Sequence, residues 1–306
     1  MSGAQQTTLP VRHEYADING VRLHYAAAGE GPLIVFLHGF PEFWYAWKGQ
    51  LAEFGRDHLA VAPDMRGYNL SSRPQGVEEY RIERLVEDIR ALVEHLGRRR
   101  FTLVAHDSGG GVAWSFALTY PALLERMIII NMAHPATFDR EMKVNPAQQR
   151  ASQYMLLFRS PEAEQVLSAD TYGRFTKGLL ATGMEKGYFD EDGRQAYIGA
   201  WSQPGGLTGG LNYYRASRVG PPNGPDSPAN GNYAPAGVSL MVTVPTLVIW
   251  GEQDTALLTA NLDGLEQYVP NLTLKRVPDA THWIVHEQPA LVNRYIREFL
   301  NDGGAA

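Results

Sequence analysis

Short apolar segments alternate with longer amphipathic ones along most of the chain. The apolar segments cover residues 21–29, 32–39, 58–64, 101–107, 126–133, 245–251 and 272–278. Most are continuous apolar runs, which are typical of parallel strands buried on both faces. Between them, residues 80–97 and 290–300 repeat apolar side chains at helical spacing. This order predicts an α/β fold with a mostly parallel, twisted sheet flanked by helices.

The alternation stops between residues 135 and 240. This stretch has helical pieces at 148–159 and 192–202 but no convincing buried strand. We therefore predict a core domain formed by residues 1–134 and 241–306, and a helical cap formed by residues 135–240. The Gly- and Pro-rich passage 219–237 fits either an ordered loop or a disordered linker, and the sequence leaves both open.

Composition narrows the class of partner. The chain has 306 residues, a net charge of -6 and no cysteine. The negative charge argues against nucleic acid or an anionic membrane surface as the main partner. The lack of cysteine excludes disulfides, thiolate metal sites and cysteine nucleophiles, and it fits a reducing cytoplasm. The apolar runs are too short to span a bilayer, and the first residues lack the apolar stretch of a signal peptide. We expect a cytoplasmic protein without a membrane partner; a homo-oligomer is compatible with the sequence.

The segment "LVAHDSGGGVAW", residues 103–114, predicts a sharp turn from a strand into a helix and offers two nucleophiles, Asp107 and Ser108. Such a turn requires small residues two positions before the nucleophile and two and three positions after it. Around the aspartate these positions hold Ala105, Gly109 and Gly110. Around the serine the preceding position holds His106, which is large. The spacing therefore selects Asp107 as the nucleophile.

A carboxylate at this turn predicts a two-step reaction. It can attack an electrophilic sp3 carbon without a base and form an ester of its own side chain. Hydrolysis of that ester then needs a base to activate water and an oxyanion hole facing the carboxylate carbon. Taken alone, Asp107 also fits an ordinary helix N-cap, so its partners decide between the two interpretations.

Two further residues complete a candidate catalytic triad. Asp254 directly follows one predicted strand, and His282 lies between the last predicted strand and the last helix. An aspartate there can orient the imidazole and stabilise it when protonated. Asp254 alone also fits a helix cap. His282 and His286 have the spacing of a helical metal site, but His282 lies outside the predicted helix and no acidic ligand motif accompanies the pair.

From about residue 19 to 300 the chain resembles the α/β-hydrolase fold superfamily and, within it, the epoxide hydrolases. "HGFPE", residues 38–42, is similar to the His-Gly-x-Pro motif of that family. The resemblance implies an α/β-hydrolase fold with a helical cap inserted after the sixth strand. It also implies an oxyanion hole formed by the backbone N–H groups of Phe40 and Ser108.

The cap carries the more specific part of the resemblance. "LNYYRAS", residues 211–217, resembles the Asn-Trp-Tyr-Arg segment of the family, and "YMLLFRSPEAE", residues 154–164, resembles a second segment less tightly. The resemblance assigns Tyr214 and Tyr154 as the phenols that donate hydrogen bonds to the epoxide oxygen, a suitable task for a neutral hydroxyl. The chain departs from the family at Ser108, where many epoxide hydrolases carry tryptophan.

Together these observations predict an epoxide hydrolase, a hydrolase acting on ether bonds, that forms a vicinal diol through an ester at Asp107. We expect no metal and no organic cofactor. We also expect His38, Pro41 and Trp283 to contact the substrate. Several aromatic side chains suggest a small apolar or aryl epoxide, although they also fit core and cap packing: Phe43, Trp44, Trp201 and Trp283.

Three alternatives stay open. A haloalkane or haloacid dehalogenase would use the same nucleophile, but such enzymes typically place tryptophan or arginine where this chain has Ser108. A serine esterase would need Ser108 at the turn position that Asp107 occupies. A catalytically silent hydrolase-fold protein could serve as a ligand receptor, and turnover of a substrate distinguishes it from the enzymes.

Overall fold

The computed structural model describes residues 10–302, and there one sheet has the strand order β1-β2-β4-β3-β5-β6-β7-β8. The strands are β1 (Arg12–Ile18), β2 (Val21–Ala28), β3 (Leu33–Leu37), β4 (Leu59–Pro63), β5 (Phe101–His106), β6 (Leu124–Ile130), β7 (Thr246–Gly251) and β8 (Leu272–Val277). β1 pairs antiparallel with β2, β2 pairs antiparallel with β4, and the other pairs are parallel. The prediction of a mostly parallel sheet is confirmed. Each predicted strand segment contains one of β2 to β8, except that β6 begins two residues before the predicted segment 126–133.

The sequence pattern does not predict β1. It is an edge strand, and Ala16 is its only buried residue. An edge strand that buries so little needs no apolar run, because one of its sides and most of its side chains face solvent.

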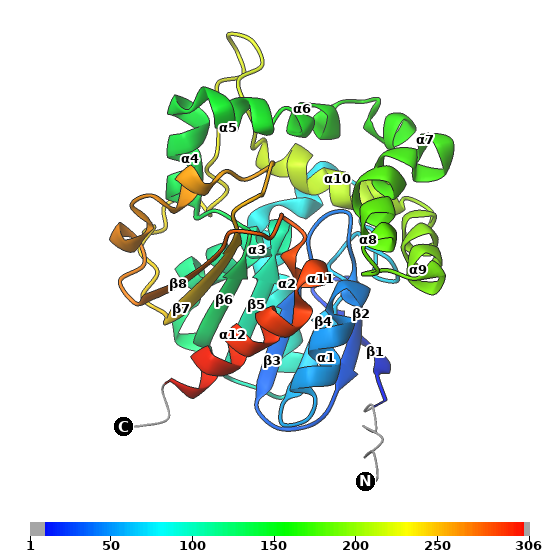
Figure 1. The fold of residues 1–306 in the computed structure, drawn as a ribbon, viewed down its shortest axis with the longest axis vertical. Helices are drawn as coiled ribbons and strands as arrows, with labels where there is room; N and C mark the ends of the chain where they lie inside the picture. Colours follow the sequence, from blue (N-terminus) through cyan, green and yellow to red (C-terminus); the bar gives the residue numbers. More distant parts are fainter. Residues whose placement is uncertain (1–9, 303–306) are drawn as a thin grey trace.

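Helices cover both faces of the sheet (Figure 1). α1 (Lys48–Phe54), α11 (Ile284–Glu287) and α12 (Pro289–Asn301) pack on one face, and α2 (Ile82–His95) and α3 (Asp107–Thr119) pack on the other. Side chains alternate between these faces along each strand. On β5, for example, Leu103 and Ala105 join the core under α2 and α3, and Val104 joins the core under α1 and α12.

A layer of helices between β6 and β7 lies over the carboxyl ends of the parallel strands (Figure 1). The layer contains α4 (Pro135–Val144), α5 (Pro146–Ala151), α6 (Tyr154–Arg159), α7 (Ala163–Phe175), α8 (Ala181–Glu185), α9 (Glu191–Trp201) and α10 (Gly206–Ser217). Its position agrees with a cap inserted after the sixth strand. The domain boundaries at residues 135 and 240 stay a prediction.

The passage 219–237 folds against this layer as a loop. Gly220 and Asn230 pair through backbone hydrogen bonds, and the side chains of Val219 and Tyr233 are buried. Gly231 lies so close to the Phe138 carbonyl group that an added Cβ would overlap it. These contacts favour the ordered loop over the linker.

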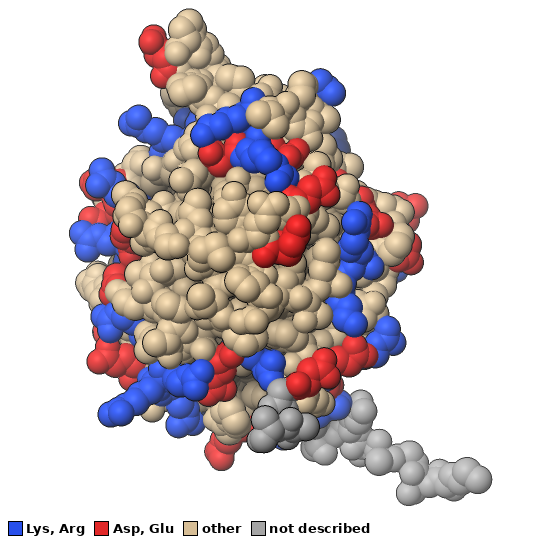
Figure 2. Space-filling model, turned by 90° about the vertical axis from the view of Figure 1, so that its left-hand side faces the viewer, with Lys and Arg blue, Asp and Glu red and all other residues tan. Residues whose placement is uncertain are grey.

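Within residues 10–302, no helix has the length and apolar character needed to cross a membrane. The expectation about a signal peptide rests on residues 1–15, and residues 1–9 of this stretch lie outside the described residues. On the face shown in Figure 2, Lys and Arg are mixed with Asp and Glu around a broad uncharged area. That face therefore offers no continuous basic patch for nucleic acid.

Candidate active site

The turn between β5 and α3 holds Asp107 in a left-handed backbone conformation, with φ 50°. Non-glycine residues rarely adopt this conformation, and it is found mainly where the surrounding structure fixes it. A Cβ on Gly109 would overlap the carbonyl oxygen of His38, and a Cβ on Gly110 would lie 2.6 Å from Cβ of Met132. The small residues that select Asp107 in the sequence are therefore required by close packing of α3 against its neighbours.

The loop after β3 faces the Asp107 carboxylate with backbone donors. Phe40 N–H donates to Oδ1 of Asp107 at 2.8 Å, and the backbone of Ser108 is one of the groups that lower the pKa of that carboxyl. Gly39 passes so close that a Cβ there would overlap the Asp107 side chain. Phe40 N–H therefore faces the carboxylate, as the prediction requires. The assignment of Phe40 and Ser108 to an oxyanion hole stays a prediction.

His282 lies between two carboxylates. Its Nδ1 donates to Oδ2 of Asp254 at 2.7 Å, and its Nε2 lies 3.3 Å from Oδ2 of Asp107. The other oxygen of Asp254 accepts the N–H groups of Ala256 and Leu257 at 2.8 and 2.9 Å. Asp254 thus combines the two interpretations of the sequence: one oxygen caps a turn and the other orients the imidazole.

Asn131, which the sequence analysis missed, also holds Asp254. It directly follows β6, and its Nδ2 donates to Oδ2 of Asp254 at 2.8 Å. Its Oδ1 accepts the N–H of Gly251 at 2.8 Å, which fixes the orientation of the amide. The one indication in the sequence is its place after an apolar strand, at the same edge of the sheet as Asp107 and Asp254.

Neighbouring charges and hydrogen bonds keep Asp107 as a carboxylate and His282 as an imidazolium. Burial alone would raise the pKa of Asp107, but the hydrogen bond and charge of His282 lower it to about 2. Burial lowers the pKa of His282, but the charges and hydrogen bonds of Asp254 and Asp107 raise it well above its ordinary value. Asp107 is therefore ionised at neutral pH.

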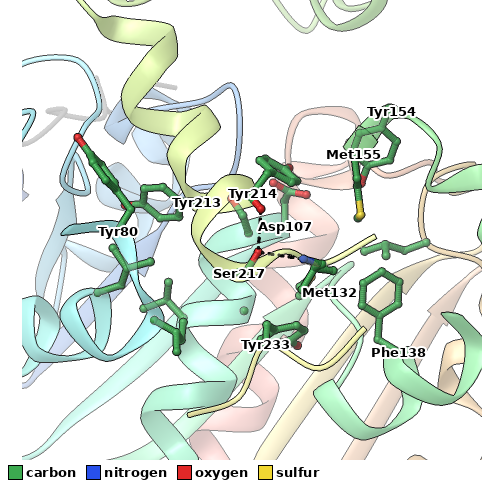
Figure 3. A pocket seen from close by; sticks show the side chains of 17 residues that line it. Tyr80, Asp107, Met132, Phe138, Tyr154, Met155, Tyr213, Tyr214, Ser217 and Tyr233 are labelled. Atoms are coloured by element: carbon green, nitrogen blue, oxygen red, sulfur yellow. Dashed lines mark hydrogen bonds between the residues drawn. The ribbon is translucent and has the colours of Figure 1, made fainter. Parts of the chain in front are cut away.

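Asp107 lies where two arms of a cavity meet. The first, the Tyr233 arm, is lined mainly by apolar and aromatic side chains. Figure 3 shows it with Tyr80 and Tyr213 on one side, Asp107 and Tyr214 near the centre, and Tyr154, Met155 and Phe138 on the other side. The second, the Trp283 arm, is lined by Phe40, Pro41, Asp107, Tyr154, Phe158, Arg174, Phe175, Gly178, Leu179, Tyr214, Ala256, His282 and Trp283.

Both predicted cap tyrosines line both arms above Asp107. The ring centroids of Tyr154 and Tyr214 are 6.5 Å apart. Burial and the negative charge of Asp107 hold the pKa of each phenol well above its ordinary value, so both keep their protons. Neither hydroxyl forms a hydrogen bond with a residue in the range 10–302, which leaves both available to a ligand.

Of the three residues predicted to contact the substrate, two line the cavity and one does not. Pro41 and Trp283 line the Trp283 arm. His38 lines neither arm, contrary to expectation, because it is fully buried with Nε2 accepting from Met65 N–H and Nδ1 bonded to the Gly39 carbonyl. It therefore positions backbone and has no surface to offer a substrate. Three of the aromatic residues that suggested an aryl substrate also lie outside both arms: Phe43, Trp44 and Trp201.

Comparisons with known proteins show the family to which the chain belongs. The α/β hydrolase fold family matches residues 32–289. Epoxide hydrolase 4 of Homo sapiens is 35% identical over 292 residues, which cover 93% of this chain and 77% of that protein. The chain belongs to the epoxide hydrolases of the α/β-hydrolase fold. It is also 39% identical to YfhM, an AB hydrolase superfamily protein of Bacillus subtilis, over 95% of this chain and 99% of that one. A Bacillus megaterium epoxide hydrolase crystallised with an inhibitor has a TM-score of 0.89 and 40% identity, covering 94% of this chain and 100% of that chain.

This epoxide hydrolase also contains a buried hydrogen-bond network around the Glu42 carboxylate, beneath the active site. Glu42 Oε1 accepts from His286 Nε2 at 2.5 Å and from the Tyr197 hydroxyl at 2.9 Å. Its Oε2 lies 3.3 Å from Nδ1 of His106, whose Nε2 donates to the His282 carbonyl at 2.8 Å. Burial works against the charge of Glu42, yet both histidines hold its pKa well below the ordinary value. The network thus joins Tyr197 on α9, Glu42 in the loop after β3, and the backbone of His282.

The network also bears on the alternative metal interpretation. His282 and His286 turn to different carboxylates, Asp254 and Glu42, and therefore do not form a ligand pair. Within residues 10–302 no cluster of three or more His, Cys, Asp or Glu side chains could hold a metal ion. The sequence analysis did not use Glu42, although a charged residue directly after Pro41 in an apolar segment indicated a buried partner.

Proposed function

We propose that this protein hydrolyses an epoxide to a vicinal diol through a covalent ester at Asp107. The carrying observation is the position of the Asp107 carboxylate, with backbone donors at Oδ1, His282 at Oδ2 and two unbonded phenols above it. The predicted cap, residues 135–240, supplies both phenols. No organic cofactor or metal enters the scheme. The cysteine-free chain fits the cytoplasm, where we place the enzyme.

In the first step, Oδ2 of Asp107 attacks one carbon of the epoxide. A C–O bond forms and the ring C–O bond breaks, while Tyr154 and Tyr214 donate hydrogen bonds to the leaving oxygen. One phenol passes its proton to the developing alkoxide. Phenols raised in pKa by burial are neutral donors in the free enzyme, and the alkoxide is the stronger base once the ring opens.

In the second step, His282 activates water against Cγ of Asp107. Ester formation removes the negative charge at Asp107, which is one of the influences that raise the pKa of His282 in the free enzyme. The imidazolium thus loses its proton more readily after alkylation. That proton returns the phenolate left by the first step to a phenol, and the neutral imidazole becomes the base that takes a proton from water. The N–H groups of Phe40 and Ser108 then stabilise the oxyanion on Oδ1.

The shape and lining of the cavity suggest the substrate class. Both arms are lined mainly by apolar and aromatic side chains, which is typical of sites that bind small organic molecules. A variant of the Bacillus megaterium relative was crystallised with a naphthyloxy-propanediol product. We therefore propose a small apolar or aryl epoxide as substrate.

The function is tested by assaying diol formation from a panel of aryl and alkyl epoxides with wild type, Asp107→Ala and Asp17→Ala. Asp17 is a matched control because its side chain is 85% exposed on β1. Wild type and Asp17→Ala are expected to form diol, and Asp107→Ala is expected to form none. Diol from Asp107→Ala at the wild-type rate would refute the assignment.

A second variant tests the covalent step. His282→Gln should still be alkylated but should hydrolyse the ester slowly, so that intact-protein mass spectrometry detects one substrate mass added per chain. Consumption of epoxide by His282→Gln without any adduct would contradict the two-step scheme. If wild type forms no diol from any epoxide, halide release from haloalkanes and haloacids is the next assay.

A further inference from the structure

Helix α9 is fastened to the loop after β3, the loop that carries Phe40, by two side-chain donors. Trp201 Nε1 donates to the Pro41 carbonyl at 2.6 Å, and the Tyr197 hydroxyl donates to Oε1 of Glu42 at 2.9 Å. The two donors are four positions apart on α9 and therefore lie on one face of the helix. Both side chains are buried, and neither lines an arm of the cavity. The proposed reaction gives them no role.

The two ends of this loop are held by residues outside the helical layer. At its start, the buried ring of His38 hydrogen-bonds to the loop backbone, and at its end Trp44 N–H donates to Oδ1 of Asp64 at 3.0 Å. Between these anchors, the buried Pro41 carbonyl has Trp201 as its one donor within residues 10–302. A buried carbonyl group without a partner is costly, so loss of this donor favours a turn of the peptide toward another one.

The Pro41 carbonyl is one residue away from the backbone N–H that faces the nucleophile. Phe40 N–H donates to Oδ1 of Asp107 at 2.8 Å. A rotation that carries the Pro41 carbonyl away from Trp201 also tilts this N–H, because the two groups are joined through Phe40. A donor stabilises a developing oxyanion when it lies about 2.7–3.1 Å from the charged oxygen, so a small tilt is enough to weaken it.

We propose that Trp201, assisted by Tyr197, positions the Phe40 N–H for the oxyanion that forms at Asp107 during ester hydrolysis. Both are positioning residues, because they act through the loop and contact neither the cavity nor the reacting atoms. During alkylation the Asp107 carboxylate loses its charge, whereas during hydrolysis Oδ1 gains a full negative charge. The N–H therefore matters most in the second step, and α9 should control that step and not the first. The inference rests on the proposed function.

Rapid-quench kinetics with intact-mass detection of the ester tests this, with the aryl epoxide that wild type hydrolyses fastest. Trp201→Phe keeps an aromatic ring but removes the donor. It is expected to slow ester hydrolysis about 2- to 12-fold, the factor by which one hydrogen bond shifts an equilibrium between two loop positions, and to leave alkylation within about twofold of wild type. Tyr197→Phe is expected to act in the same direction by a smaller factor, because two histidines still hold Glu42. Should Trp201→Phe fail to fold, Tyr197→Phe carries the test with the same two rate constants.

The pH dependence separates the Phe40 N–H from the base. A backbone N–H does not titrate, so Trp201→Phe should slow ester hydrolysis by the same factor at every pH and keep the midpoint of the wild-type profile. A shifted midpoint would place the effect on His282, whose carbonyl belongs to the Glu42 network, and would overturn the assignment to Phe40.

Arg140→Gln is the matched control. Arg140 on α4 also donates from the helical layer to backbone carbonyl groups, those of Asp263 and Ala260 at 2.6 and 2.8 Å, but these follow β7 and Arg140 lines neither arm. It should leave both rate constants at the wild-type values. Ester hydrolysis at the wild-type rate in Trp201→Phe, or an equal fall in alkylation, would overturn the inference and leave the proposed function intact. The same selective fall in Arg140→Gln would also overturn it. If wild type forms neither ester nor diol, the proposed function itself is wrong.

Discussion

Replacing Asp254 with asparagine should block the second half of the reaction through the tautomer of His282. One oxygen of Asp254 accepts two backbone N–H groups, so the amide oxygen of the new side chain must take that place. The amide NH2 then replaces Oδ2 and faces His282 Nδ1 and the NH2 of Asn131. The side-chain amide of Asn131 cannot flip to offer its oxygen instead, because that oxygen already accepts the N–H of Gly251.

The imidazole must therefore accept at Nδ1 and carry its proton on Nε2, the atom that should receive the proton of water. In a serine protease the corresponding change keeps the geometry and lowers kcat by about 10⁴. We expect a similar loss of about 10³ to 10⁴ in ester hydrolysis here. Alkylation should stay within about tenfold of wild type, because Asp107 attacks without a base.

Rapid-quench kinetics with intact-mass detection measures both steps. Asp254→Asn should give a burst of one ester per active site followed by very slow diol formation. Asn131→Ala is the matched control, because it removes one hydrogen bond to the same oxygen but keeps the carboxylate. It should lower kcat about 2- to 12-fold without an ester burst. If kcat of Asp254→Asn falls less than tenfold, or if no ester accumulates, the tautomer mechanism is wrong.

Three further predictions concern the phenols of Tyr154 and Tyr214, the buried carboxylate of Glu42, and the tight turn between β5 and α3, here called the elbow. Tyr154→Phe and Tyr214→Phe should each slow alkylation about 10- to 150-fold, the range for a hydrogen bond to a developing charge, and single-turnover kinetics with unchanged unfolding curves would verify this. Glu42→Gln should lower the free energy of unfolding by about 2 kcal/mol or more in urea titrations at pH 7, because the amide replaces a charged acceptor shared by buried donors. The pKa of Glu42 in the folded protein lies well below its ordinary value. The charge of Glu42 therefore stabilises the fold above the unfolded pKa of about 4.3, and this stabilisation is lost as pH falls further. A difference in the free energy of unfolding between wild type and Glu42→Gln that grows on acidification would contradict this. Gly109→Ala should destabilise the fold by about 1 to 3 kcal/mol and reduce activity, because the new Cβ overlaps the His38 carbonyl group, and a fully active, equally stable Gly109→Ala protein would argue against the tight elbow.

The strands around the site were predictable because their burial is a local property of the sequence. A strand covered on both faces is mainly apolar, so β3, β5 and β7 stand out as buried runs, as does β6 from Met127 onward. β1 was missed because it buries little at the edge of the sheet. The turn at Asp107 was predictable for a similar reason, since it depends on the sizes of residues two and three positions away.

The triad could be inferred because parallel strands bring their carboxyl ends to one edge, so Asp107, Asp254 and His282 had to lie near one another. By contrast, hydrogen-bond partners and the residues that line a cavity could not be predicted from the local sequence. Glu42 contacts His286 across 244 positions, and Asn131 contacts Asp254 across 123 positions. His38 looked like a substrate contact but packs beneath the loop. Local pattern and steric size thus determined the strands, the elbow and the order of the triad. Only the tertiary structure decided which buried polar groups pair and which hydroxyls stay free, because those outcomes depend on segments that approach each other only after the chain has folded.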